Sequence, residues 1–303
     1  MALIEPLKKI AEEQLDLLRV ALYVASEGSA KFEGEVLTCS LTEPKRRTST
    51  LLAMAAGQSI NTILRMSELR GIAVRDVYPI TRSAVETFIN AAFLLSEEDS
   101  VAERAIRYVS YAGWKHTNRV VGSGEFALTI SSDPDPEGTV ANLFPEFSGS
   151  GKGSWTSFDT GSRIRRVGEL AGCKAGSRLL AAYALIYNIS SEIIHGSTYG
   201  VSYFYGTHRP PSPTLEEFLK HTERQLEDNL VAALHAVAGY LAAFFEVQGM
   251  QKLSAVEQRV FDDLLSLSGT EQAGAPPSTV QATPGIKKGK RNAQPINPPD
   301  ATR

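Results

Sequence analysis

Apolar residues recur at helical spacing through most of the chain, and no segment alternates between apolar and polar residues as a half-buried strand would. The first helix is predicted from Pro6 to about Ser26, and Gly28 ends it. The same spacing predicts further helices at about residues 45–70, 79–95, 99–121, 163–170, 177–194, 213–247 and 252–267. The pattern therefore predicts an all-α bundle of about eight helices.

Two segments lack the helical periodicity. Residues 122–160 are rich in Gly, Ser, Pro and Asp, which favour turns, so a long irregular loop is predicted there. Residues 269–303 are rich in Pro and Gly and carry a Lys/Arg run at 287–291, which is typical of a disordered basic tail. Such a tail is either a solvated spacer or a weak nucleic-acid contact. We interpret the chain as one all-helical domain, residues 1–268, followed by this tail.

The composition of the chain excludes only a few classes of function. The chain has 303 residues and a formal net charge of −3, so its overall charge does not indicate nucleic-acid binding. The two cysteines, Cys39 and Cys173, suggest neither a disulfide framework nor a metal site, and the first residues do not resemble a signal peptide. The apolar segment Leu230–Phe245 is shorter than the roughly 20 residues that a membrane-spanning helix needs, which favours a buried core helix. We therefore expect a soluble cytoplasmic protein without a membrane segment.

The predicted helix before Gly196 ends in chemically capable side chains. One of its faces carries, at four-residue intervals, Tyr183, Tyr187, Ser191 and His195. His195 lies at the negative end of the helix dipole, which favours the imidazolium form and makes His195 a candidate general acid. The alternative is a capping histidine that binds the last backbone carbonyls of the helix.

A second candidate is the pair Arg82 and Glu86 on the helix predicted at 79–95. The four-residue spacing permits an ion pair on one helix face, and the neighbouring residues are mostly apolar. If the pair is buried, Arg82 is a fixed cation that can bind a phosphate or stabilise developing negative charge. A solvent-exposed surface pair is the alternative.

A third candidate is a basic stripe on the helix predicted at 99–121. Its members are Arg104, Arg107, Lys115 and Arg119, with Tyr111 between them. Cations interleaved with aromatic rings can follow a nucleic-acid backbone and stack on bases, although an ordinary solvated helix face has the same appearance.

Metal and cofactor binding are not expected from the sequence. Glu192 and His195 match only one half of the di-iron carboxylate signature, which needs a second Glu-x-x-His pair and two further glutamates. There is also no phosphate-binding Walker loop. We therefore predict a site without a metal ion or cofactor.

Three short motifs resemble an uncharacterised all-helical bacterial family that is distantly similar to HEPN domains. They are Arg82-x-x-x-Glu86, Arg107-Tyr108 and Tyr187-x-x-Ser190-x-x-x-x-His195-Gly-Ser, and the resemblance covers roughly residues 50–205. It implies a helical bundle, frequently dimeric, and many HEPN domains are metal-independent ribonucleases of toxin or phage-defence systems. Their mark is an arginine followed, after four to six residues, by a histidine. No histidine of this chain has an arginine at that interval.

The resemblance also implies roles for the candidate residues. RNA cleavage by transesterification needs proton transfer and a cation to stabilise the phosphorane. His195 would transfer the proton and Arg82 would supply the cation, held by Glu86, while Tyr187 or Ser191 would orient the imidazole. Arg104, Arg107, Lys115 and Arg119 would contact RNA.

Two functions follow as hypotheses from the sequence. The first is a HEPN-like, metal-independent endoribonuclease of a toxin or phage-defence system, which acts on RNA and forms a homodimer. The alternative is a non-catalytic helical module that binds a partner protein or a nucleotide, in which the polar residues form a buried network that gives specificity. The sequence names neither the RNA nor the partner.

Overall fold

The computed structural model describes residues 3–148 and 153–267, and these are predominantly α-helical, which confirms the predicted all-α class. The tail predicted at 269–303 lies outside the described residues. The longer helices are α1 (Ile4–Glu27), α3 (Leu51–Met66), α4 (Val77–Ser96), α5 (Asp99–Thr117), α7 (Thr160–Leu170), α8 (Cys173–Ile194), α10 (Leu215–Val247) and α11 (Gln251–Leu267). The shorter ones are α2 (Glu43–Lys45), α6 (Pro136–Leu143) and α9 (Thr198–Phe204), with the π-helix η1 (Arg46–Thr50) and the 3-10 helices η2 (Gly71–Asp76) and η3 (Pro145–Phe147).

Helix ends follow local sequence signals. Gly28 ends α1 in a left-handed conformation (φ 77°), and its N–H donates to the carbonyl of Val24. At the start of α10, Thr214 and Glu217 form a capping box, in which each side chain accepts a hydrogen bond from the backbone N–H of the other residue. Both signals lie close to where the sequence predicts these ends.

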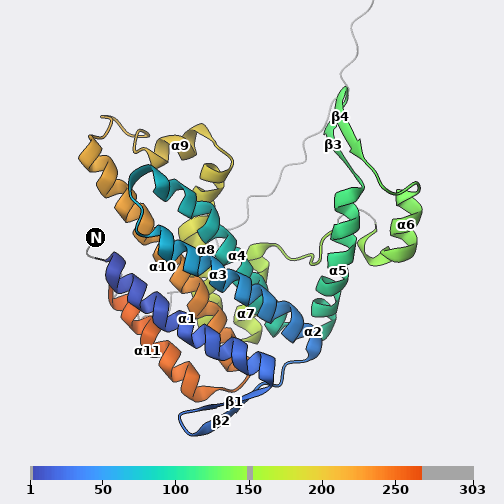
Figure 1. The fold of residues 1–303 in the computed structure, drawn as a ribbon, viewed down its shortest axis with the longest axis horizontal. Helices are drawn as coiled ribbons and strands as arrows, with labels where there is room; N and C mark the ends of the chain where they lie inside the picture. Colours follow the sequence, from blue (N-terminus) through green and yellow to red (C-terminus); the bar gives the residue numbers. More distant parts are fainter. Residues whose placement is uncertain (1–2, 149–152, 268–303) are drawn as a thin grey trace, which may run out of the picture. The chain divides into compact units, whose positions relative to one another are not determined.

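Helix α10 forms much of the core. It packs against α1, α4, α8 and α11 (Figure 1), and residues Leu230 to Phe245 are buried apart from the partly exposed Val231. The ring of Tyr240 in α10 lies 5.7 Å from that of Phe88 in α4. Among the described helices, α10 is long and apolar enough to cross a membrane by length and composition, and 83% of that apolar window is buried within the fold. A buried core helix passes the same test, so hydropathy alone does not indicate a membrane span.

Helices α7 and α8 meet at two glycines. A Cβ atom built on Gly176 of α8 would lie 2.7 Å from the Cα of Gly168 in α7. Only glycines allow two helix backbones to come this close. The contact brings the residues of α7 and α8 next to α4, which touches both helices.

Two β-hairpins depart from the helical pattern, which predicts no strand. β1 (Ser29–Phe32) pairs with β2 (Glu35–Thr38), and β3 (Arg119–Ser123) pairs with β4 (Phe126–Ile130), both antiparallel. Each strand has only four or five residues, too few for a clear alternation, and the turns between them contain glycines with positive φ. As a consequence α5 ends at Thr117, before the predicted position.

The β3–β4 hairpin exposes apolar side chains. It continues from the end of α5 (Figure 1), and its residues are exposed on both strands. Val121 pairs with Leu128, and Phe126 is 91% exposed. Together with α6 and η3, the hairpin gives residues 122–160 more regular structure than the predicted loop.

Candidate functional site

An arginine–tyrosine cluster joins α4, α7 and α8; its members are Arg82, Glu86, Arg163, Tyr183 and Tyr187. The Arg82–Glu86 ion pair that the sequence predicts is present, with Arg82 Nε donating to Glu86 Oε1 at 3.0 Å. The guanidinium carbon of Arg82 lies 4.5 Å from the ring centroid of Tyr187, which is a cation–π contact. Tyr187 in turn stacks on Tyr183 at 4.4 Å. The cluster therefore ties Arg82 to α8.

Burial sets the electrostatics of this cluster. The side chain of Arg82 is 18% exposed, and its Nη1 is buried without a hydrogen-bond partner among the described residues. Burial lowers the pKa of Arg163, and the Glu86 carboxylate opposes that shift. Burial, with help from a hydrogen bond to Tyr187, raises the pKa of Tyr183 to about 12. The Tyr183 phenol is therefore neutral at pH 7.

His195 lies apart from this cluster. It is exposed and follows the last residue of α8, and within residues 3–148 and 153–267 its side chain makes no hydrogen bond or ion pair. The guanidinium of Arg75 binds the carbonyl of Ile193 at 3.3 Å and so takes the capping role considered for His195. Eight residues separate His195 from Tyr187, about 12 Å along the helix at about 1.5 Å per residue. The fold of one chain therefore does not bring His195 to Arg82.

Ser191 lines a surface groove between α8 and α9. The groove has a volume of about 490 Å³ and is also lined by Tyr187, Glu192 and Tyr203. The carboxylate of Glu192 accepts a hydrogen bond from the hydroxyl of Ser197, the residue that caps α9. Glu192 is thus used within the fold. In the described ranges, no group of three or more His, Cys, Asp or Glu side chains could hold a metal ion.

The basic stripe on α5 divides into two parts. Arg104 donates to the carbonyls of Glu146, Ser154 and Trp155 at 3.0–3.2 Å, and Arg107 forms an ion pair with Glu146. These two arginines therefore hold the segment that follows α6. Of the remaining members, Lys115 lies 5.9 Å from the ring of Tyr111, and Arg119 contacts the imidazole of His116 at 3.1 Å. Both are exposed to solvent.

A pocket that the sequence did not predict lies between η1, α3, α4 and α5. We call it the α3–α5 pocket; its volume is about 400 Å³. Its walls are mostly apolar and include Leu52, Leu94 and Ile106, with the aromatic rings of Tyr108 and Trp155. This size and lining are typical of sites for small organic ligands.

Several contacts hold the walls of the α3–α5 pocket in place. The segment before α3 is a π-helix, an irregularity that frequently occurs at functional sites. Within it, the hydroxyl of Ser49 donates to the carbonyl of Ala91 in α4 at 2.9 Å. Across the pocket, the ring of Trp155 packs edge-on against Phe93 at 6.0 Å, and its carbonyl accepts from Arg104. The pocket is therefore built by elements that are fixed to one another.

Two polar side chains of the α3–α5 pocket have no partner in the described part of the chain. Asn90 lies on the same face of α4 as Glu86 and Leu94, and its Oδ1 is buried without a hydrogen bond. An unpaired buried acceptor costs about 1–3 kcal/mol. Arg47, in the π-helix, is exposed and makes no ion pair there. The sequence contained a signal for Asn90, because it is the one polar residue between Phe88 and Phe93.

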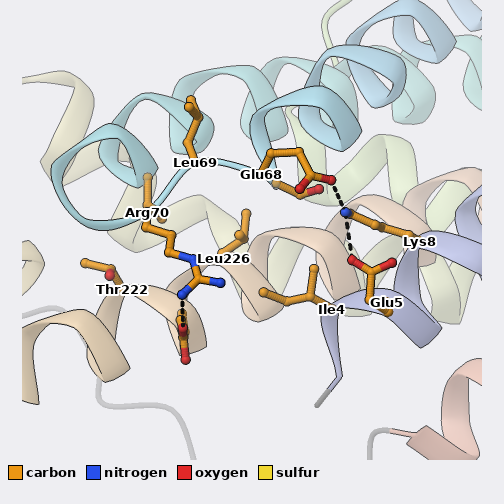
Figure 2. Close-up of a pocket in the computed structure, with 11 residues that line it drawn as sticks. Ile4, Glu5, Lys8, Glu68, Leu69, Arg70, Thr222 and Leu226 are labelled. Atoms are coloured by element: carbon orange, nitrogen blue, oxygen red, sulfur yellow. Dashed lines mark hydrogen bonds and ion pairs between the residues drawn. The ribbon is translucent and has the colours of Figure 1, made fainter. Parts of the chain in front are cut away.

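A smaller cavity lies near the start of α1, and none of its described lining residues has a buried, unpaired polar atom. Its volume is about 50 Å³, and it lies between α1, the end of α3 and α10. Figure 2 shows that its charged residues are paired: Lys8 contacts Glu5 and Glu68, and Arg70 contacts Glu223 at 3.8 Å. These ion pairs join the helices, and the cavity is too small for more than a few water molecules.

Part of the chain is similar to a known protein family. The sequence profile of a family of unknown function (DUF5677) matches residues 49–210. This confirms the predicted resemblance to an uncharacterised family. No curated protein and no solved structure matches the chain. The matched range includes the arginine–tyrosine cluster, His195 and most of the α3–α5 pocket.

Proposed function

We propose a ligand-binding function for this chain, which belongs to the DUF5677 family of unknown function. In this proposal the protein is a non-catalytic helical module that binds a nucleotide in the α3–α5 pocket. The observation that carries the proposal is the pocket itself, which has a volume of about 400 Å³, mostly apolar walls and the exposed cation Arg47 among its lining residues. Ligand sites usually combine apolar walls with a small number of polar groups.

The chemistry of the lining favours a nucleotide over other small ligands. Tyr108 and Trp155 offer aromatic faces on which a planar base can stack. Arg47 is an exposed cation at the pocket and is suited to a phosphate. A purely apolar ligand would leave Arg47 unused.

Filling the pocket tests this function directly. We expect Ala105→Trp to reduce nucleotide affinity at least about tenfold, because Ala105 lines the pocket and an indole there occupies the ligand's space. Binding is measured by isothermal titration calorimetry with AMP, GMP, CMP and UMP. Glu103→Trp is the matched control, because it places the same ring on the exposed side of α5. Absence of binding by the unmodified protein to all four nucleotides would overturn the proposal.

The HEPN-like endoribonuclease remains the second candidate, because Arg82 is a fixed cation inside the family's matched range. The geometry favours the endoribonuclease less than the ligand-binding module. Arg82 is already held by Glu86 and by the ring of Tyr187, and His195 is about a further 12 Å along α8. A shared centre would need His195 and Arg82 from two different copies of the chain.

An RNA cleavage assay separates the two candidates. We expect no cleavage of end-labelled cellular RNA in excess chelator, by either the unmodified protein or His195→Ala, because the proton donor and the cation lie apart. Cleavage by the unmodified protein alone would contradict this and establish a metal-independent ribonuclease. Because His195 is exposed, His195→Ala should leave the melting temperature unchanged. If only the unmodified protein cleaved RNA, the unchanged melting temperature would show that the variant had lost activity and not its fold.

A further inference from the structure

We infer that the surface groove between α8 and α9 is a second ligand site, which binds the ammonium group of a small primary amine. We call it the α8–α9 groove; its volume is about 490 Å³. No described residue lines both this groove and the α3–α5 pocket. The groove is therefore separate from the proposed nucleotide site, and its ligand is a different one.

Glu192 gives the α8–α9 groove its charge. It is the one charged side chain among the described residues that line the groove. Its Oε2 accepts a hydrogen bond from the hydroxyl of Ser197, whereas its Oε1 makes no hydrogen bond in the described ranges and is not fully buried. Arg82, which contacts the lining residue Tyr187, is already paired with Glu86. The groove therefore presents an accessible carboxylate oxygen to a cationic ligand.

Two further acceptors lie beside this carboxylate on α8. Asn188 is one helical turn before Glu192, and Ser191 is the residue next to it; both line the groove. Neither side chain makes a hydrogen bond with another described residue, and Asn188 is exposed. A protonated primary amine carries three N–H donors and no acceptor, so it can use all three oxygens. A phosphate or carboxylate ligand would instead be repelled by Glu192.

Two tyrosines of α9 supply an aromatic wall. Tyr199 and Tyr203 are one helical turn apart, and their ring centroids are 6.2 Å apart with the planes inclined at 38°. Tyr199 is 54% exposed, so its ring is open to a ligand. The face of a phenol ring attracts a cation and also packs against an apolar group. Leu185 and Ile189 of α8 extend the apolar lining, which favours an amine with an apolar or aromatic body.

The contact between α8 and α9 holds these groups in place. A Cβ atom built on Gly200 would lie 2.5 Å from the carbonyl oxygen of Glu192, so a glycine is needed for α9 to come this close to the end of α8. The N–H of Gly200 donates to the hydroxyl oxygen of Ser197 at 2.9 Å, and that hydroxyl donates to Glu192. The ring of His221 lies 5.8 Å from that of Tyr203 and supports it. Groups that are already fixed lose little freedom when a ligand binds.

Isothermal titration calorimetry on the full chain tests the inference with phenethylamine and phenethyl alcohol, which differ only in the ammonium and hydroxyl groups. We expect the amine to bind at least about tenfold more tightly than the alcohol, because only the amine forms a charge-assisted hydrogen bond with Glu192. Equal affinities would overturn the inference, because the groove would then recognise the aromatic body and not the charge.

Glu192→Gln tests the carboxylate. The amide keeps an acceptor for Ser197 and removes the charge, so the variant should keep its melting temperature and bind phenethylamine at least about tenfold more weakly. Its affinity for phenethyl alcohol should not change. Glu216→Gln, which removes an exposed carboxylate from α10, is the matched control. An unchanged affinity of Glu192→Gln for the amine would overturn the inference.

Two further variants locate the bound amine. Tyr199→Ala should weaken amine binding at least about threefold, and Tyr23→Ala, which removes a 59% exposed ring from α1, should not. Ala105→Trp fills the α3–α5 pocket and should leave amine binding unchanged. If Ala105→Trp abolished amine binding, the amine would lie in the α3–α5 pocket and the α8–α9 groove would not be its site. Absence of amine binding by the unmodified protein would overturn the inference, whereas nucleotide binding would still stand on its own titrations.

Discussion

Replacing Glu257 by alanine is expected to lower the free energy of unfolding by about 3–5 kcal/mol, the usual cost of leaving one partner of a buried ion pair alone. Arg178 in α8 and Glu257 in α11 are 4% and 1% exposed, and Arg178 Nη1 lies 2.6 Å from both carboxylate oxygens. The guanidinium carbon also lies 3.7 Å from the ring of Phe261. Removing Glu257 would therefore leave a buried cation with no carboxylate.

Urea denaturation followed by circular dichroism measures this effect. The control is Lys220→Ala, which breaks an exposed pair with Glu216 on α10 and should cost no more than about 1 kcal/mol. The double variant Arg178→Met with Glu257→Leu should recover most of the lost stability, because it removes both charges and keeps the volume filled. A loss below about 1 kcal/mol for Glu257→Ala would show that α11 does not depend on this pair.

Helical periodicity was sufficient to predict the longer helices, because most of them bury one face against their neighbours. The predicted span 177–194 lies within α8, and the helix predicted from residue 213 starts two residues before Leu215, the first residue of α10. The pattern did not predict the β3–β4 hairpin. Its apolar residues are exposed, so burial does not impose a readable alternation on them.

The sequence predicted less of the candidate sites than of the helices. The ion pair of Arg82 and Glu86 was predictable because both residues lie on one helix, four positions apart. The α3–α5 pocket was not, because Leu52, Asn90 and Trp155 come from distant parts of the sequence. Spacing along a single helix says nothing about which other helix faces it. For this reason the sequence could single out His195 but not show that it lies apart from Arg82.

The contact between α7 and α8 depends on Gly176, and we expect Gly176→Ala to lower the free energy of unfolding by about 1–3 kcal/mol, the usual cost of overpacking a core. The new Cβ would lie 2.7 Å from the Cα and 3.0 Å from the nitrogen of Gly168. Both atoms belong to the backbone of α7, so no side chain can rotate away to relieve the clash. The two helices must move apart, and Arg163 on α7 moves with them.

Gly113→Ala is the matched control, and it should change stability in the opposite direction. Gly113 lies in α5, and a Cβ built there meets no atom within 4 Å. Alanine is favoured over glycine inside a helix by about 0.5–1 kcal/mol, so Gly113→Ala should raise the melting temperature. Thermal unfolding followed by circular dichroism measures both variants. If Gly176→Ala also raised the melting temperature, the close approach of α7 and α8 would be wrong, and with it the position of Arg163 beside Trp155.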